Sequence, residues 1–155
     1  MVENQDYKEL LQLLNAAGVE YLVVGGHAVM EYSEPAYTKD LDLWIHNTPE
    51  NAARIFRALA EFGAPLESDG ITTGTFADDD ITYQIGIAPN RIDILTTISG
   101  VEFTDAWSNR KQSRMFSIDV NIISLEDLIK NKTATGRDAD ARQLKQLQRQ
   151  LKGKN

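Results

Sequence analysis

The pattern of apolar and polar residues changes its period along the first third of the chain. Over residues 6–17 apolar side chains recur every three to four positions, which predicts an amphipathic helix that ends at a glycine. Residues 21–24 form a short run of aromatic and β-branched residues, typical of a strand, and Gly25-Gly26 interrupts this run. We expect a short helix over residues 27–32, and residues 40–46 again predict a strand.

Capping residues mark the next helix. Thr48 is a favourable N-cap, Pro49 suits the first helical position, and the pattern runs to Phe62 before Gly63 ends it. The following residues are rich in β-forming side chains, and we expect strands over residues 71–76, 81–87 and 91–95, with a turn at 78–80.

The last third of the chain changes from strands to helices. A helical turn is expected over residues 102–107 and a hairpin or bent strand over residues 115–123. Ser124 then predicts a helix start, with Asp127 in the capping-box position that Glu usually takes. A final helix should cover residues 138–151. This order of elements predicts a small α/β or α+β protein.

Length and composition narrow the class of protein. A chain of 155 residues is by default one domain, and its apolar and charged shares of 42% and 25% are ordinary for a globular protein. It has no cysteine, which excludes disulfides and thiolate metal sites. No apolar run approaches the roughly 20 residues needed to span a membrane, and the first residues lack the build of a signal peptide. We therefore expect a soluble, cytoplasmic protein that does not associate with a membrane.

The charge is strongly negative but unevenly distributed. A net charge of −7 is poorly suited to non-specific nucleic-acid binding, which depends on Lys and Arg. Residues 130–154 are the exception, because they carry eight basic side chains against Asp138 and Asp140. Such a segment is either a local basic surface or simply a solvated helix face, and the pattern alone favours the second interpretation.

Two carboxylates in an apolar strand need an explanation. Side chains alternate along a strand, so Asp40 and Asp42 share one face while Leu41 and Leu43 point to the core. The two acidic positions lie about 6.6 Å apart at a rise of ~3.3 Å per residue. Partly buried like charges at this separation repel each other, and a cation would offset the repulsion. Mg²⁺ prefers carboxylate oxygens and also binds substrate phosphates.

A third carboxylate appears in a similar setting. Asp93 lies between Ile92 and Ile94 in the segment RIDIL. If this strand lies beside residues 40–45, three carboxylates converge and could hold two metal ions ~3.5–4 Å apart. Gly25-Gly26, between a strand and a helix, would let the backbone approach a phosphate at a helix N-terminus.

These motifs resemble a known superfamily. The segments VVGGHAV (23–29), TKDLDLWI (38–45) and RIDIL (91–95) are similar to those of nucleotidyltransferases of the DNA-polymerase-β-like superfamily. Residues 47–63, 83–95 and 124–147 further resemble small bacterial toxin nucleotidyltransferases of the AbiEii/MenT type. The resemblance covers nearly the whole chain and implies an α+β fold: a mixed β-sheet flanked by helices, with a C-terminal helical segment. We expect a single domain over residues 1–155, with a core over about 1–123 and C-terminal helices over about 124–151.

The resemblance also implies roles for individual residues. Asp40, Asp42 and Asp93 would bind Mg²⁺ or Mn²⁺, and Asp93 would also help to activate an acceptor hydroxyl. Gly25 and Gly26 would hold the triphosphate of an NTP cosubstrate, from which an NMP or a short nucleotide tract is transferred.

Two other residues are candidates for the nucleotide site on weaker grounds. Lys132 reaches the triphosphate or is merely an exposed helix residue, and Thr38 positions the metal loop or merely favours the strand. Of the two histidines, His27 is expected to face solvent at a helix start, although it could also contact phosphate, and His46 is expected to be structural.

Several alternatives stay open from the sequence. Relatives often have Arg where this chain has Ala36-Tyr37, and Ser where it has His27, so a catalytically silent nucleotide-binding or partner-binding module is the alternative function. A Mg²⁺-dependent nuclease or phosphatase is a weaker third reading. The acceptor is open between a tRNA, a protein and a small molecule. A toxin–antitoxin or phage-defence role would imply a cognate antitoxin or toxin partner.

Overall fold

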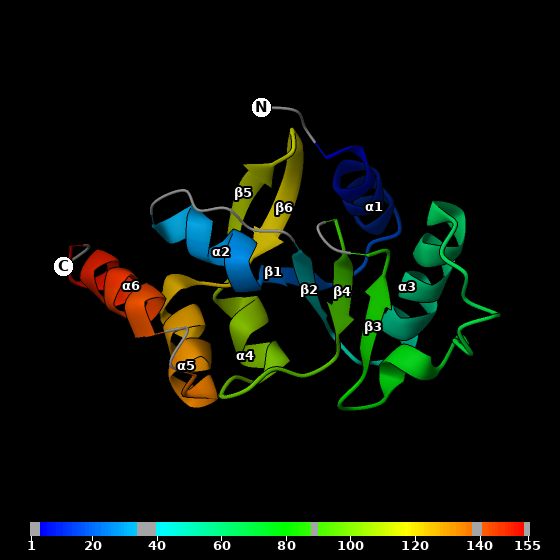
Figure 1. The fold of residues 1–155 in the computed structure, drawn as a ribbon. Coiled ribbons are helices and arrows are strands. Elements are labelled where there is room, and N and C mark those ends of the chain that lie inside the picture. Colours follow the sequence, from blue (N-terminus) through cyan, green and yellow to red (C-terminus); the bar gives the residue numbers. More distant parts are fainter. Residues whose placement is uncertain (1–3, 34–39, 88–89, 138–140, 154–155) are drawn as a thin grey trace.

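The computed structural model describes residues 4–33, 40–87, 90–137 and 141–153, which build a single six-stranded sheet with helices around it (Figure 1). The strand order is β3-β4-β2-β1-β6-β5. The β2–β4 and β1–β6 pairs are parallel and the other neighbours antiparallel, so the sheet is mixed, as predicted. The strands are β1 (Tyr21–Val24), β2 (Leu41–Ile45), β3 (Thr82–Ile85), β4 (Ile92–Leu95), β5 (Lys111–Met115) and β6 (Ile118–Ile122).

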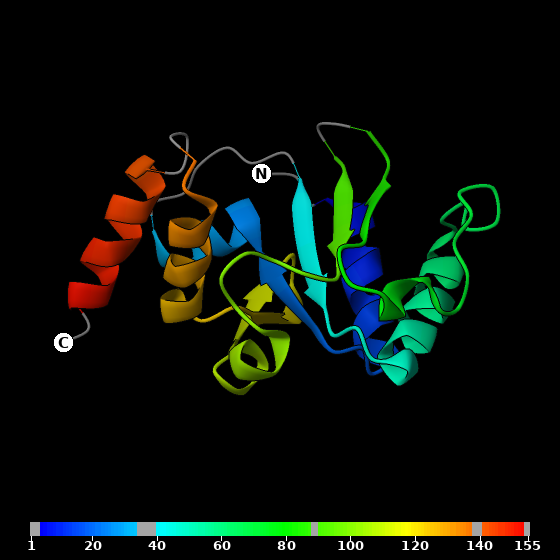
Figure 2. The same ribbon diagram turned by 90° about the horizontal axis from the view of Figure 1, so that it is seen from below.

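The helices gather toward the two ends of the sheet (Figure 2). α1 and α3 pack against each other at one end, whereas α5 and α6 lie at the other end, where α2 contacts both. Their bounds are α1 (Gln5–Ala16), α2 (Gly25–Tyr32), α3 (Pro49–Phe62), α4 (Phe103–Ser108), α5 (Leu125–Thr135) and α6 (Ala141–Gly153). These positions confirm the expected α+β fold with a C-terminal helical segment.

The expected caps are present at the helix ends. The Thr48 hydroxyl accepts a hydrogen bond from Asn51 N at 3.2 Å, and Ser124 Oγ accepts one from Asp127 N at 3.1 Å. Gly63 ends α3 with a φ of +96°, a left-handed conformation that glycine adopts without strain. Interactions between residues close in the sequence therefore account for these helix boundaries.

The strand expected over residues 71–76 was wrong. This segment forms turns followed by a short 3₁₀ helix, Thr75–Ala77. Thr72 N donates to Thr75 Oγ1 at 2.9 Å and Thr75 N donates to Thr72 O at 3.2 Å. Such local hydrogen bonds compete with a strand ladder, and Phe76 alone of this helix is buried.

The expected hairpin near residues 115–123 exists but starts earlier. Its first strand, β5, begins at Lys111 and is mostly exposed and polar, as an edge strand can be. Phe116 and Ser117 form the turn with positive φ values of 54° and 65°. β5 is mostly polar, so it lacks the alternation of apolar residues that indicates a strand.

A hydrophobic core runs through the described part of the molecule. It includes Leu10, Leu11 and Leu14 of α1, the inward residues of the central strands, and Leu147 of α6, all fully buried. No helix in the described ranges is long and apolar enough to cross a membrane. The division at about residue 123 stays a prediction.

Asn51 ties α3 to the sheet and offers a test of this packing. Its side chain is buried, accepts a hydrogen bond from Glu20 N at 2.8 Å, and donates to Glu20 O at 3.0 Å and His46 O at 2.7 Å. Asn51→Ala leaves these backbone groups unsatisfied, and we expect a loss of about 2–4 kcal/mol in the free energy of unfolding, measured with urea. Asn47→Ala, which removes an exposed hydrogen bond to Asp79, should cost less than about 1 kcal/mol. Equal losses in the two variants would contradict this account.

Candidate active site

Three predicted site residues meet where two neighbouring strands begin. β2 and β4 are parallel, and their register pairs Asp42 with Asp93. Neighbouring strands lie about 4.8 Å apart and paired residues point to the same face, so these carboxylates share one surface. Asp40 precedes β2 by one residue and belongs to the same face as Asp42. The structure thus brings Asp40, Asp42 and Asp93 together, and their roles stay predictions.

The Arg91 guanidinium lies between two of these carboxylates. Its Nε donates to Asp93 Oδ1 at 2.9 Å, and one terminal nitrogen donates to Asp40 Oδ2 at 3.1 Å. The same terminal nitrogen is 3.3 Å from Asp93 Oδ2, so two nitrogens of the fork engage Asp93. Arg91 faces the carboxylates because it lies two residues before Asp93, and its role was missed in the sequence.

Burial and neighbouring charges change the ionisation of Asp42. Removal from water raises the pKa of Asp42 to about 7, and repulsion by Asp93, a hydrogen bond with Asp93 and repulsion by Asp40 act in the same direction. Arg91 opposes this rise, but its hydrogen bonds go to the other two carboxylates. Near neutral pH, without a bound cation, Asp42 is therefore partly protonated.

Gly25 permits the close approach of α2 to Asp42. Its φ is +67°, and a Cβ atom at this position would collide with Asp42 Oδ2. Glycine alone avoids both problems. α2 therefore starts beside the carboxylates, with Gly25 and Gly26 in its first turn. Unpaired N–H groups at a helix N-terminus attract anions such as phosphate.

The donor atoms suit a hard divalent cation. All are carboxylate oxygens, which Mg²⁺ and Mn²⁺ prefer, and Asp40 Oδ1 is buried without a hydrogen-bond partner. As placed, however, no group of three or more acidic, histidine or cysteine side chains within the described ranges could hold a metal ion. Arg91 instead pairs with Asp40 and Asp93, and so engages carboxylate oxygens that a cation would need. The residues fit a divalent cation by their chemistry, provided that the Arg91 side chain turns away.

An aromatic trio of Tyr7, His27 and Phe116 borders this site. Its ring centroids are 5.6–5.8 Å apart in edge-to-face contacts. Tyr7 donates from its hydroxyl to Arg91 O at 3.2 Å, and burial together with the charges of Asp40, Asp42 and Asp93 raises the pKa of Tyr7 to about 12.

His27 corrects one expectation from the sequence. It is only 7% exposed instead of facing solvent, and its Nε2 is buried with no hydrogen-bond partner among the described residues. The reason is tertiary, since α1 and the β5–β6 turn supply the two rings that cover it. Tyr7 and Phe116 were missed as site residues because no local motif marks them.

The remaining candidates are placed less directly. Lys132 is buried on α5 rather than exposed, and α5 contacts α2. Thr38 lies outside the described residues, as do Ala36 and Tyr37. His46 is structural as expected, with Nδ1 2.7 Å from Glu20 Oε1 and its ring stacked on Phe103.

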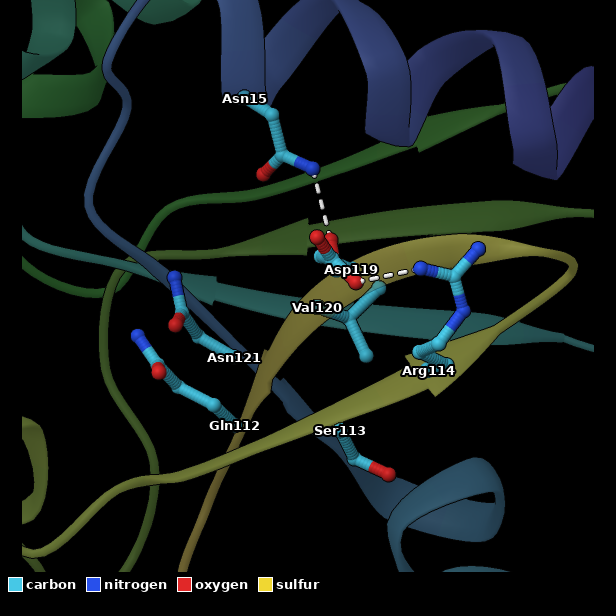
Figure 3. Close-up of a pocket in the computed structure, with 7 residues that line it drawn as sticks. All are labelled: Asn15, Gln112, Ser113, Arg114, Asp119, Val120 and Asn121. Carbon is cyan, nitrogen blue, oxygen red and sulfur yellow. Dashed lines mark hydrogen bonds and ion pairs between the residues drawn. The ribbon is translucent and has the colours of Figure 1, made fainter.

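A separate polar cavity lies between the end of α1 and the β5–β6 hairpin (Figure 3). Its volume is about 550 Å³. Asn15 Nδ2 donates to Asp119 O at 2.7 Å, and Arg114 pairs with Asp119 at 2.8 Å across its wall. None of the three site carboxylates lines this cavity, so we do not assign the reaction to it.

The pKa of Asp42 gives a testable pH dependence. Between about pH 4 and pH 7 folded Asp42 holds a proton that the unfolded chain releases, so the contribution of Asp42 to stability without divalent cations falls as the pH rises. Asp42→Asn removes this loss. We expect the variant to equal the wild type near pH 4 and to exceed it by roughly 1–3 kcal/mol above pH 7, in urea unfolding with EDTA.

The matched control is Asp119→Asn, which changes an aspartate that is 83% exposed on β6. Its difference from the wild type should not change with pH. If Asp42→Asn follows the pH profile of the wild type, burial does not raise this pKa.

Comparisons with known proteins agree with this geometry. A search among curated proteins found no match. Among solved structures, a candidate nucleotidyltransferase from Thermotoga maritima superposes with a TM-score of 0.61 at 15% identity, over 94% of this chain and 91% of the other. The lincosamide antibiotic adenylyltransferase LnuA, solved with lincomycin bound, gives a TM-score of 0.59 at 13% identity, over 95% of this chain and 97% of the other. At these identities the likeness concerns the fold.

The sequence itself matches a family model over residues 3–155, nearly its full length. The model describes nucleotidyl transferases of unknown function, and the two superposed structures resemble the fold over at least 94% of this chain. The chain therefore belongs to the family described as "nucleotidyl transferase of unknown function (DUF2204)".

Proposed function

We propose that this nucleotidyltransferase uses Mg²⁺ or Mn²⁺ to move an NMP or a short nucleotide tract from an NTP to an acceptor hydroxyl or phosphate. The observation that carries the proposal is the pairing of Asp42 with Asp93 on parallel strands, with Asp40 beside them and the start of α2 against Asp42. This arrangement combines carboxylate oxygens with an anion-attracting helix terminus, the two parts that phosphoryl transfer needs.

The carboxylates divide the work in this proposal. Asp40 and Asp42 would hold the cation, and Asp93 would complete its ligands and accept the proton of the acceptor hydroxyl. The acceptor oxygen attacks the α-phosphorus, a new P–O bond forms, the bond to the β-phosphate breaks, and pyrophosphate leaves. When bound, the divalent cation supplies positive charge that favours both the attack and the departure of pyrophosphate.

The nucleotide would lie with its triphosphate at the N-terminus of α2. Gly25 and Gly26 would present their N–H groups to the phosphates, and His27, with its unpartnered Nε2, could donate one further hydrogen bond. Lys132 and Thr38 complete the proposed nucleotide contacts. A positive charge on Lys132 would favour the phosphates.

One observation favours the alternative, a catalytically silent module with this fold. Arg91 forms ion pairs with both Asp40 and Asp93. A protein that had lost catalysis could keep this ion-pair network for stability alone. The two functions differ in whether the chain releases pyrophosphate from an NTP.

The finer likeness to toxin nucleotidyltransferases of the AbiEii/MenT type also belongs to the proposal. It predicts a cytoplasmic enzyme, a toxin–antitoxin or phage-defence role and a cognate partner protein. Growth arrest on expression in a bacterial host, lost in Asp93→Asn, would support this role, and unaffected growth would count against it.

Asp93→Asn tests the enzymatic proposal. We expect it to lower Mg²⁺-dependent release of pyrophosphate by at least about 100-fold, because it removes a metal ligand and the proton acceptor. The assay supplies α-³²P-labelled NTPs with total RNA and a soluble protein extract, and it follows both pyrophosphate and labelled acceptor. Asp78→Asn, at an exposed turn, should keep the wild-type rate.

Mg²⁺-dependent binding of an NTP without any pyrophosphate release from the wild type would instead support the silent module. Equal activity of Asp93→Asn and the wild type would show that the carboxylates are not the catalytic site.

Arg91→Met tests whether the arginine and the metal ion use the same place. Without divalent cations we expect the variant to melt at a lower temperature than the wild type at pH 8, because the carboxylates lose their counter-charge. Added Mg²⁺ should raise the melting temperature of the variant more than that of the wild type. Arg114→Met, which breaks an exposed Arg–Asp pair, should change little under either condition. An equal response of Arg91→Met and the wild type to Mg²⁺ would contradict a shared place.

A further inference from the structure

α6 carries a regular row of positive charge on its outer surface. Arg142, Lys145, Arg149 and Lys152 are all exposed, and they recur at intervals of three, four and three residues. Positions three or four apart lie on one side of a helix, so these side chains form one cationic stripe about 15 Å long. The helix contains no acidic residue.

The cationic stripe is not used inside the protein. The ion pairs found among the described residues do not include any of its four members. The opposite side of α6 is apolar, with Leu147 fully buried and Leu144 and Leu151 partly buried, and the helix packs on α5 and α2. Because the apolar face is already covered, α6 cannot bury it in a membrane surface, and the stripe faces outward.

The stripe differs from the rest of the chain in its charge. The protein as a whole carries −7, whereas α6 is uniformly positive. A polyanion would therefore be repelled by most of the surface and attracted to this flank. Gln146 and Gln148 lie three or four positions from members of the stripe, and their amides can donate hydrogen bonds to phosphate and sugar oxygens. This is the composition of a surface for a nucleic-acid backbone.

The position of α6 connects the stripe to the carboxylates. α6 contacts α2, and α2 begins at Gly25 against Asp42. Figure 2 shows α6 on the same side of the molecule as α2 and α5, with α3 at the opposite end. The stripe lies on the side of α6 opposite its packed face, so a strand held along it would have to pass around α6 to reach the start of α2.

We propose that the cationic stripe of α6 binds the sugar–phosphate backbone of a single-stranded nucleic acid, and that this strand is the acceptor of the transfer. The binding stands on the stripe alone, and only the acceptor role rests on the proposed function. The stripe recognises the charge of the phosphates rather than the base sequence, because Arg and Lys side chains on an exposed helix contact the backbone of a nucleic acid.

The test measures binding of a 5′-fluorescein-labelled single-stranded RNA 12-mer by anisotropy over a range of NaCl concentrations. Four neutralised phosphates on a single strand predict a slope of about −2.8 in a plot of log K against log salt. Arg142→Gln/Lys145→Gln should reduce the slope to about −1.4 and weaken binding at least about tenfold at 50 mM salt.

The chain offers a matched control on its far side. Arg54→Gln/Arg57→Gln removes two exposed charges, also three residues apart, from α3. This double variant should bind RNA as the wild type does, with the same slope. Competition by unlabelled single-stranded DNA at equal strength would indicate recognition of phosphate alone, and weaker competition would indicate a contribution of the ribose; both support backbone binding.

Other outcomes would overturn the proposal. The absence of RNA binding at 50 mM salt would overturn it, and so would equal losses of RNA binding in the two double variants. A wild-type dimer that Arg142→Gln/Lys145→Gln dissociates in sedimentation, without any change in RNA binding, would do the same. Retention on phosphatidylserine vesicles that depends on Arg142 and Lys145, without RNA binding, would also overturn it.

The same proteins separate this proposal from the proposed function. If the proposed function fails, RNA still binds through α6 but no Asp93-dependent pyrophosphate is released. If the proposal for the stripe is wrong, Asp93-dependent release of pyrophosphate persists at the wild-type rate in Arg142→Gln/Lys145→Gln.

Discussion

The parallel pairing of β2 with β4 is the constraint on which the site depends. It fixes Asp42 against Asp93 in a partly buried position, where two like charges would destabilise the fold if both stayed ionised and unpaired. Two features reduce this repulsion: the pKa of Asp42 is raised, and the Arg91 guanidinium pairs with Asp40 and Asp93. A stable sheet alone would gain nothing from this arrangement, since apolar residues at the same positions would pack without an electrostatic cost.

Residues from α1, α2 and the β5–β6 turn surround the carboxylates. The close approach of α2 depends on glycine at position 25, and it brings a helix N-terminus to the acidic residues. The aromatic trio of Tyr7, His27 and Phe116 closes the neighbouring space with segments from three distant parts of the chain. Phe116 is held at a positive φ, which is unfavourable for a bulky residue, and its contacts with the other two rings offset that strain.

Charge is separated on a larger scale as well. The protein as a whole is negatively charged, whereas the charged side chains that α6 exposes are all positive. The apolar face of α6 packs against α5 and α2, so the basic face is available to a partner. The acidic face with the three carboxylates and the basic flank on α6 are thus separate surfaces, and α2 contacts α6 and begins against Asp42.

The sequence by itself determined the elements that local interactions fix. The N-caps Thr48 and Ser124, the glycine after α3 and the apolar periods of α1 and β2 gave correct predictions because each depends on residues a few positions apart. The motifs also allowed the proximity of Asp40, Asp42 and Asp93 to be expected, through the resemblance of the whole chain to a superfamily. The strand expected over residues 71–76 failed because hydrogen bonds between Thr72 and Thr75 replaced a sheet ladder.

Only the tertiary structure decided what surrounds those carboxylates. The ion pair of Arg91 with Asp40, the burial of His27 and Lys132, and the contact of Tyr7 with Arg91 depend on segments that lie far apart in the sequence. No period or motif encodes these distances, because they follow from how sheet and helices pack against each other. The sequence thus singled out the three acidic residues, and packing decided how close they lie and that Arg91 pairs with two of them.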